Sequence, residues 1–379
     1  MQTLELAVSA ASGLEAVVRR ELFSLGVDKA PAYNGKLTFF GTLETVARCN
    51  LHLRTANRVF VVLSRFPAAT FDELFEGVRN TDFSLLPDDA AVTVRAASQK
   101  SALFAHSALQ SVTKKAVAEA FSRRGLGSLP ETGPRFELEI SLCEDVGTLL
   151  LNTSGAGLHR RGYRKLTGQA PLKETLAAAL VALSVWNPSR PFADPFCGTG
   201  TLPVEAAMAA CRMAPGKKRD FDFLHWPCFD RALFDRLVEE AETGEVRPEA
   251  EIFGSDLDPG QLELAEVHAR EAGVAPFVRF FRADARHFSS GLARGVAVSN
   301  PPYGERLSDE REALALMRDY ARAAAQLPDW CFYLLSPLDL EGCWGRPADR
   351  RRKLYNGNLC CQFYSFLAPR PPSSGQNRR

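Results

Sequence analysis

Apolar and polar residues in the first 150 positions either alternate or recur at a helical spacing. Apolar residues at positions 14, 17, 18, 22 and 25, for example, predict a helix over 13–25. In chain order the pattern predicts a strand over 4–10, that helix, a strand over 36–41, a helix over 43–53, strands over 57–66 and 91–98, a helix over 102–121 and paired strands within 136–155. Strands and helices that alternate with short connections favour a ferredoxin-like α+β unit.

From residue 171 onward, helical periodicity alternates with short, fully apolar runs. This pattern is typical of parallel strands that helices cover on both faces. The predicted elements are a helix from 172, a strand over 191–196, a helix from 201, a strand over 250–256, a helix over 260–272, and strands over 278–284 and 295–299. We therefore expect an α/β fold, with a Rossmann-like, doubly wound domain preceded by an α+β module and a boundary near residue 165.

The overall composition does not change these predictions, except where charged residues cluster in short segments. The formal net charge of +1 argues neither for nor against nucleic acid, but residues 158–165 carry four Lys/Arg, and residues 344–379 carry eight against one acidic residue. The N-terminus lacks a signal-peptide pattern, and the apolar stretch 175–186 is shorter than the roughly 20 residues that cross a bilayer. The nine cysteines form no CxxC pair, which favours reduced thiols in a cytoplasmic protein.

The segment ADPFCGTGT (193–201) joins a predicted strand to a predicted helix. Gly198 and Gly200 allow the backbone to approach a ligand, and the helix N-terminus offers free N–H groups. The spacing matches neither GxxxxGK[ST] nor GxGxxG, so it predicts neither a P-loop nor a full dinucleotide fingerprint. A short glycine loop is by itself most often a turn, so the interpretation depends on the strands that follow.

Acidic residues end the next two predicted strands. An acid in the position of Asp256 can hydrogen-bond a ribose diol, whereas Asp258 followed by Pro259 fits a helix N-cap. Asp284 ends the following strand, where it could meet the base of the same ligand. Because the carboxyl ends of parallel strands share one edge of a sheet, these residues predict a ligand crevice there.

The segment SNPPYGERL (299–307) follows the fourth strand on that edge. The chain thus carries, in this order, a glycine loop, an acid placed to bind a ribose, an acid placed to contact a base, and NPPY. This order of motifs resembles the S-adenosyl-L-methionine-dependent methyltransferases that act on exocyclic amines. Such an amine on a purine is a poor nucleophile because its lone pair is delocalised into the ring. Oxygens of Asn300 and Pro301 can accept its two N–H bonds and so favour the pyramidal nitrogen of the transition state.

The remaining residues of this segment have supporting roles in the same interpretation. Pro301 and Pro302 stiffen the loop, and Tyr303 can stack on an extruded base. No metal-ligand cluster is visible, and none is needed for this chemistry. The predicted catalytic residues are Asn300, Pro301, Pro302 and Tyr303. The predicted cofactor-binding residues are Asp194, Pro195, Phe196, Gly198, Thr199, Gly200, Thr201, Asp256, Leu257, Asp284 and Ala285.

The wider chain resembles the THUMP-domain RNA methyltransferases, in particular the bacterial 23S rRNA guanine-N2 methyltransferase group. The motifs that carry this resemblance most specifically are GYR…APLKETLAAAL (162–180), DPFCGTGT (194–201) and NPPYGERL (300–307), and RRKLYNGNL (351–359) completes it. The resemblance implies four parts: a ferredoxin-like domain (1–65), a THUMP RNA-binding domain (66–157), a linker (158–170) and a methyltransferase domain (171–368). The composition of PRPPSSGQNRR (369–379) separately predicts a flexible tail. It also implies S-adenosyl-L-homocysteine as product, and RNA, most simply 23S rRNA, as substrate.

Further residues are assigned by the same resemblance. Gln169, Ala170, Pro171 and Lys173 would border the methionine end of the cofactor, and Lys353, Leu354, Asn356 and Gly357 would lie near the substrate. Basic residues that could meet RNA phosphates are Lys114, Lys115, Arg160, Arg161, Arg164, Lys165, Arg351, Arg352 and Lys353. A solvated charged face is the alternative interpretation of these residues.

Several functions remain open at this point. NPPY is shared with N6-adenine DNA methyltransferases and with protein glutamine methyltransferases, and a tRNA guanine would present the same amine as an rRNA guanine. A non-enzymatic RNA-binding scaffold is a further alternative, although Gly198, Gly200, Asp256, Asp284 and Asn300 are all present. Some rRNA enzymes of this group carry a second methyltransferase domain, which these 379 residues do not include.

Overall fold

The computed structural model describes residues 3–33, 35–126, 129, 131–164, 172–304 and 307–369. It divides the chain into two compact units. The first comprises Met1–Ala11, Val18–Leu158 and Pro215–Glu240, and the second comprises Ser12–Val17, His159–Ala214 and Ala241–Arg379. A segment from the C-terminal half of the sequence therefore belongs to the first unit.

The first unit is built on a seven-stranded sheet with the order β2-β3-β1-β4-β7-β6-β5, in which only β5 and β6 pair in parallel among the strands described. Its strands are β1 (Leu4–Ser9), β2 (Ala32–Tyr33), β3 (Lys36–Gly41), β4 (Arg58–Pro67), β5 (Ala91–Gln99), β6 (Arg135–Cys143) and β7 (Val146–Asn152). Its helices are α2 (Leu43–His52), α3 (Phe71–Arg79) and α4 (His106–Phe121), together with most of α1 (Glu15–Ser24) and most of α7 (Arg231–Thr243).

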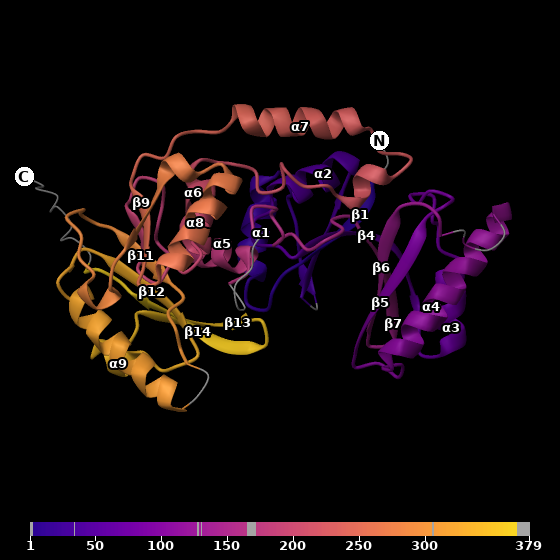
Figure 1. Ribbon diagram of the computed structural model, residues 1–379. Coiled ribbons are helices and arrows are strands. Elements are labelled where there is room, and N and C mark those ends of the chain that lie inside the picture. Colours follow the sequence, from indigo (N-terminus) through magenta and orange to yellow (C-terminus); the bar gives the residue numbers. More distant parts are fainter. Residues whose placement is uncertain are drawn as a thin grey trace, which may run out of the picture. The chain divides into compact units, whose positions relative to one another are not determined.

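Strand β6 shows how the sequence produces this sheet. Phe136, Leu138, Ile140 and Leu142 alternate along it with polar residues, and all four are fully buried. Helices α3 and α4 lie side by side against β5, β6 and β7 in Figure 1. Each of these four side chains stabilises the unit by about 1.5–3 kcal/mol when it leaves water.

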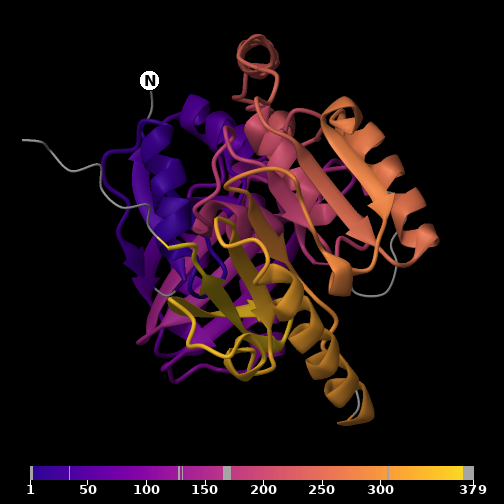
Figure 2. The ribbon, with the colours of Figure 1, turned by 90° about the vertical axis from the view of Figure 1, so that its left-hand side faces the viewer.

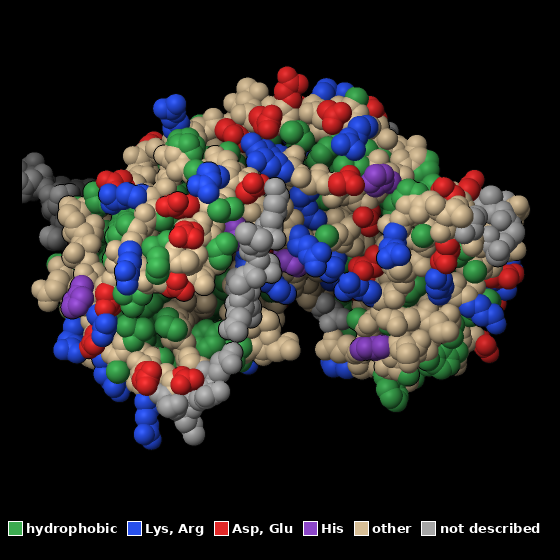
Figure 3. All heavy atoms as spheres, viewed as in Figure 1, with side chains coloured by type: hydrophobic (Ala, Val, Ile, Leu, Met, Phe, Trp, Pro, Cys, Tyr) green, Lys and Arg blue, Asp and Glu red, His purple; other side chains and the backbone are tan. Residues whose placement is uncertain are grey.

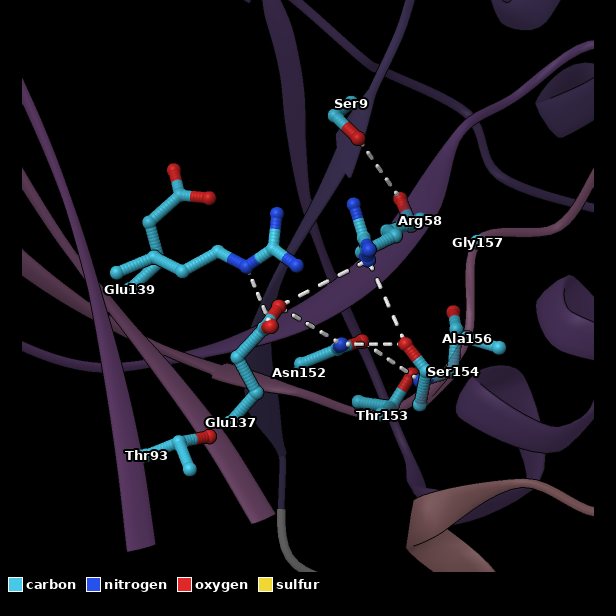
Figure 4. Close-up of polar contacts among 12 residues, drawn as sticks. Ser9, Arg58, Thr93, Glu137, Glu139, Asn152, Thr153, Ser154, Ala156 and Gly157 are labelled. Atoms are coloured by element: carbon cyan, nitrogen blue, oxygen red, sulfur yellow. Dashed lines mark hydrogen bonds and ion pairs between the residues drawn. The ribbon is translucent and has the colours of Figure 1, made fainter.

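The opposite face of this sheet carries charged residues next to a small buried apolar cluster of Ala7, Phe60 and Leu150, and it is strongly curved. Lys36 on β3 forms a 2.9 Å ion pair with Glu139 on β6, although three strands separate β3 from β6 in the sheet order. Figure 4 shows Arg58 and Asn152 directed toward Glu137 on the same face, with the Asn152 Nδ2–H donating to Glu137 Oε1 over 3.3 Å. Such contacts between distant strands require the sheet to curl, and they pair its charges with one another.

The elements predicted for this part of the sequence are confirmed with small shifts at their ends. The helix predicted over 102–121 begins at His106, and residues 67–90, which carry no predicted element, contain α3. The predicted boundary after residue 65 falls inside β4, which runs from Arg58 to Pro67. The division into a ferredoxin-like domain (1–65) and a THUMP domain (66–157) stays a prediction.

The second unit contains a mixed sheet with the order β10-β9-β8-β11-β12-β14-β13. Its strands are β8 (Phe192–Asp194), β9 (Ile252–Asp256), β10 (Val278–Arg282), β11 (Val296–Ser299), β12 (Cys331–Ser336), β13 (Arg350–Asn356) and β14 (Leu359–Phe366). Its helices are α5 (Glu174–Leu183), α6 (Thr201–Ala210), α8 (Pro259–Ala272), α9 (Leu307–Ala324) and α10 (Glu341–Trp344). The first five strands in the sheet order are parallel, and β14 and β13 are antiparallel to their neighbours.

Helices cover both faces of this sheet, as the predicted Rossmann-like fold requires. Helices α5, α6 and α8 pack next to one another, whereas α9 lies apart from them in Figures 1 and 2. Buried Met317 and Tyr320 of α9 pack in one core with Phe253 and Phe332 of the sheet. The parallel strands therefore place their carboxyl ends, and the motifs that follow them, on one edge. Among the described residues, no helix is long and apolar enough to cross a membrane.

Candidate active site

The loop after β8 is a tight turn held by backbone hydrogen bonds within itself and to β9. The Cys197 N–H donates to Ser255 O over 3.0 Å, and the Gly200 N–H donates to Cys197 O over 2.8 Å. Gly198 and Gly200 have φ values of +50° and +79°, in the left-handed region that favours glycine. The predicted glycine turn between β8 and α6 is confirmed.

The Asp256 carboxylate faces this loop from the end of β9. Its Oδ2 accepts the Gly198 N–H over 2.9 Å, and its Oδ1 accepts the Asp258 N–H over 3.0 Å. Each oxygen keeps a further lone pair, which is what a ribose diol requires. Asp258 is the N-cap of α8, with Oδ1 accepting the Gly260 N–H over 2.8 Å and Pro259 in the first turn. The predicted capping role of Asp258 is therefore confirmed, whereas the ligand role of Asp256 stays a prediction.

Asp284 has a capping role and also borders the candidate ligand site. It is the N-cap of the short 3₁₀ helix Ala285–His287, and both of its oxygens accept N–H groups of Arg286 at 2.6–3.0 Å. The Arg286 side chain hydrogen-bonds the carboxylate and lowers the pKa of Asp284 below its usual range. Asp284 is therefore ionised near neutral pH and is an acceptor for a ligand N–H.

These strand ends and the NPPY turn enclose one cavity of about 480 Å³. Such a volume is within the usual range for sites that bind small molecules. Leu257 provides an exposed apolar wall, whereas the acids provide hydrogen-bond acceptors. The cavity is lined by Pro195, Phe196, Asp256, Leu257, Ala283, Asp284, Ala285, Asn300, Pro301, Pro302, Tyr303, Gly304 and Leu316.

Asn300 is the residue in this lining with an unsatisfied buried acceptor. Its Oδ1 is buried, and no donor in the described part of the chain lies within hydrogen-bond distance. A buried amide oxygen without a donor costs free energy, so it marks a place where a ligand N–H is expected. The acceptors at Asp256, Asp284 and Asn300 fit the ribose and adenine of an S-adenosylmethionine molecule and an exocyclic amine next to it.

Asp194 lies in the interior behind this lining. Its carboxyl is 1 % exposed, and burial raises its pKa to about 7. The Phe196 N–H, which donates to Asp194 Oδ1 over 3.1 Å, acts in the opposite direction. Asp194 therefore titrates near neutral pH in the folded chain.

This raised pKa predicts a pH dependence of stability. Folding favours the protonated carboxyl, so its stabilising contribution is fully present below the unfolded pKa of about 3.9 and is lost as the pH rises through about 7. We expect Asp194→Asn to gain up to about 4 kcal/mol in free energy of unfolding relative to wild type over that interval. Urea denaturation at several pH values measures this difference. Asp235→Asn, at an exposed position, is the control, and a pH-independent difference for Asp194→Asn would contradict the assignment.

The cavity collects most, but not all, of the predicted site residues. Asp194, Gly198, Thr199, Gly200 and Thr201 form the turn behind it and are not in its wall. Gln169, Ala170 and Pro171 lie outside the described residues, and Lys173 is the exposed N-cap residue of α5. Three wall residues were not predicted: Ala283 and Gly304 adjoin predicted motifs, whereas Leu316 on α9 has no local sequence pattern that marks it.

Two predicted RNA contacts need correction. The Arg161 side chain is 2 % exposed and pairs with Glu205, with its Nε 3.5 Å from Glu205 Oε1. The Arg164 side chain is 7 % exposed, pairs with Glu174 over 3.3 Å and donates to Leu172 O. Buried and paired in this way, both arginines are too enclosed to reach a phosphate.

The other predicted RNA-binding residues stay predictions. Arg160 is exposed, and Lys165 lies outside the described residues. Lys114 pairs with Glu131 over 2.7 Å, and Lys115 lies over the Phe75 ring. On β13, Arg351 pairs with Glu341, Arg352 donates to Gly13 O, and Lys353 lies 5.5 Å from the centre of the exposed Tyr355 ring.

Comparisons with known proteins agree with this geometry. Residues 161–365 match the family described as "RMKL-like, methyltransferase domain", and residues 5–60 match "RlmL ferredoxin-like domain". The chain is 38 % identical over 97 % of its length to "Putative RNA methyltransferase YpsC" of Bacillus subtilis, and the match covers 96 % of that protein. A crystal structure of SMU.472, described as a putative methyltransferase complexed with SAH, is 40 % identical with a TM-score of 0.91, and the match covers 98 % of this chain and 100 % of that one.

A second curated relative is longer than this chain. The chain is 35 % identical over 92 % of its length to "Ribosomal RNA large subunit methyltransferase K/L" of Aliivibrio fischeri, and it spans about half of that protein, 51 %.

The Rossmann-like sheet, the glycine loop, the acidic strand ends and the NPPY turn define a methyltransferase of the class that uses S-adenosylmethionine. Within that class, the chain belongs to the family of RMKL-like methyltransferases, and its N-terminal part has the ferredoxin-like domain of RlmL proteins.

Proposed function

We propose that this protein transfers a methyl group from S-adenosylmethionine to the exocyclic N2 of a guanine in RNA, with 23S rRNA as the substrate. The observation that carries the proposal is the buried Asn300 Oδ1, which lacks a donor among the described residues and belongs to a residue that lines the cavity together with Tyr303. An amine N–H of a purine is the donor that this acceptor suits.

The chain's own residues act mainly by position. The Asn300 amide oxygen and the Pro301 carbonyl accept the two N–H groups of the amine, so its lone pair is freed from the ring as the transition state develops. Pro301 and Pro302 limit the motion of these acceptors because each ring fixes its own φ. Tyr303 stacks on the extruded base and holds the amine in line.

The cofactor supplies an electrophilic methyl group on a sulfonium when it is bound. Asp256 accepts the ribose hydroxyls, because each of its oxygens is held in place by one backbone N–H and has a further lone pair. The Asp284 carboxylate accepts the adenine amine, and Leu257 and Phe196 pack against the base. These assignments use only groups that line the cavity.

RNA as substrate rests on three supports. The relatives above are named as RNA and rRNA methyltransferases, the N-terminal part is of the RlmL ferredoxin-like type, and basic residues gather locally on β13. On the face drawn in Figure 3, acidic and basic side chains are otherwise interspersed over the second unit. RNA affinity is then expected to depend on local groups of basic side chains. The sequence predicts that the protein acts in the cytoplasm.

The hairpin of β13 and β14 is a basic group on the same edge of the sheet as the proposed site. Strand β14 is antiparallel to β12, with Gln362 opposite Ser336, so the turn at 357–358 extends beyond the carboxyl ends of the parallel strands. Lys353 and the exposed Tyr355 lie next to this turn. They would meet the phosphates and a base of the bound strand.

We expect Lys353→Glu to weaken RNA binding by about 3- to 10-fold and to reduce the slope of log K against log salt by about 1, with S-adenosylhomocysteine binding unchanged. Filter binding at several salt concentrations measures both quantities. The control is Arg270→Glu in the last turn of α8, which ends at the opposite edge of the sheet. Equal effects of the two substitutions would contradict a role for the hairpin.

Alternative substrates keep the site and change the nucleic acid. A tRNA guanine presents the same amine, and the N6 amine of adenine in DNA would also suit Asn300. Transfer of labelled methyl to total rRNA, tRNA and unmethylated DNA in parallel reactions distinguishes these substrates. We expect label in rRNA; label in DNA alone would overturn the RNA assignment, and no transfer to any of them would favour an RNA-binding scaffold or a protein substrate.

A further inference from the structure

A buried histidine on α8 contacts the glycine loop from the side opposite the cavity. His268 is 1 % exposed, and its Nδ1 lies 2.9 Å from Thr199 O. Ala265, one turn earlier on the same helix, faces the same loop, since a Cβ on Gly200 would lie 2.8 Å from Ala265 Cβ. The helix therefore packs closely against the loop and places one ring nitrogen on its backbone.

This contact determines which nitrogen of His268 carries a proton. A carbonyl oxygen only accepts, so Nδ1–H must be the donor to Thr199 O. The same peptide uses its other polar group as well, because the Gly200 N–H donates to Cys197 O over 2.8 Å. Both ends of the Thr199–Gly200 peptide are thus fixed, in a buried place where an unpaired carbonyl would be costly.

The orientation of this peptide affects Asp256, which lines the cavity, through one further hydrogen bond. Gly198, the residue before Thr199, has φ +50° and donates its N–H to Asp256 Oδ2. If the Thr199 carbonyl turned away, the Gly200 N–H would leave Cys197 O, and the Cys197–Gly198 peptide, which carries the Gly198 N–H, would lose that restraint, so its bond to Asp256 would weaken. The Asp256 carboxylate, which lines the cavity, would then lose one of the two N–H groups that orient it.

We propose that His268 is a positioning residue for cofactor binding: its Nδ1–H holds the Thr199–Gly200 peptide, and this peptide in turn keeps Gly198 and Asp256 in their binding arrangement. The inference rests on the proposed function, in which Asp256 holds the cofactor ribose. His268 touches neither cofactor nor substrate, so its loss should weaken the binding of S-adenosylhomocysteine and leave RNA affinity unchanged.

Two amide substitutions separate the hydrogen bond from simple packing. The Asn side-chain nitrogen occupies the place of His Nδ1, whereas the Gln nitrogen corresponds to Nε2, one bond farther out. We expect His268→Asn to bind S-adenosylhomocysteine within about threefold of wild type, and His268→Gln and His268→Leu to bind it about tenfold more weakly, the value of one hydrogen bond. Calorimetric titration of the full chain measures the affinities.

The outcomes distinguish this inference from the proposed function. If wild type binds no S-adenosylhomocysteine, the proposed function fails; ¹⁵N shifts of the His268 ring in the free protein then still report whether Nδ1 carries the proton. If all variants bind like wild type, His268 has no positioning role. Weak binding by His268→Asn overturns the inference even where the Gln and Leu variants do not fold, because the required donor is then present without effect.

Discussion

Replacing Asn300 by alanine is expected to lower the rate of methyl transfer by about 10²- to 10³-fold, with cofactor and RNA binding retained. The substitution removes the buried Oδ1 that has no donor in the described structure and that accepts the amine N–H in the proposed reaction. Because this bond strengthens as the amine becomes pyramidal, its loss acts on the transition state more than on binding. Single-turnover transfer of labelled methyl to RNA measures the rate.

The matched control is Asn187→Ala. Asn187 caps a turn before β8, at the edge of the sheet opposite the cavity, through bonds from Ser189 to its Oδ1. We expect this variant to transfer methyl at close to the wild-type rate. If Asn300→Ala also retained full transfer, the role assigned to Asn300 would have to be abandoned.

Gly200→Ala is expected to have the largest effect on the fold of the site. A Cβ at this position would lie 2.8 Å from Ala265 Cβ and 2.9 Å from Phe280 Cζ, and the backbone φ is +79°. Backbone strain of about 1 kcal/mol and overpacking of about 1–3 kcal/mol together predict a loss of about 2–4 kcal/mol in free energy of unfolding. Because the loop must move to relieve the contact, S-adenosylhomocysteine affinity should also fall, by about 100-fold. Urea denaturation and calorimetry measure the two quantities.

Gly273→Ala separates strain from contact. Gly273 has almost the same φ, +82°, but the nearest atom to its added Cβ is the flexible end of Met213 at 3.4 Å. We expect this variant to lose only about 1 kcal/mol and to bind S-adenosylhomocysteine normally. Equal losses in the two variants would show that the close approach of α8 to the loop is not what requires glycine at position 200.

The sequence predicts those parts of the site whose determinants are local. A short apolar run followed by Asp256 or by Asn300 marks both a strand and its end, so the shared edge follows from the parallel order of the strands. Asp258 and Pro259 similarly predict the start of α8 from two adjacent residues. Helix α3 could have been predicted in the same way, because Thr70 and Glu73 form a capping box before it.

Features that depend on distant partners could not be predicted in this way. From the sequence, Arg161 is predicted to be a surface cation. Its ion-pair partner in the interior, Glu205, lies 44 residues later, so no local pattern reveals the pair. The wall residue Leu316 and the antiparallel strands β13 and β14 likewise depend on how α9 and the end of the chain pack on the sheet. The Asp194 carboxyl has no neighbour in sequence that reveals its burial, which is what raises its pKa.

The most direct test of the account identifies the methylated nucleoside. Undermodified 23S rRNA is incubated with the protein and labelled S-adenosylmethionine, digested to nucleosides and separated by chromatography. We expect label in N2-methylguanosine. Label in N6-methyladenosine, or in no nucleoside of the rRNA, would contradict the claim that Asn300 presents the N2 amine of a guanine for transfer.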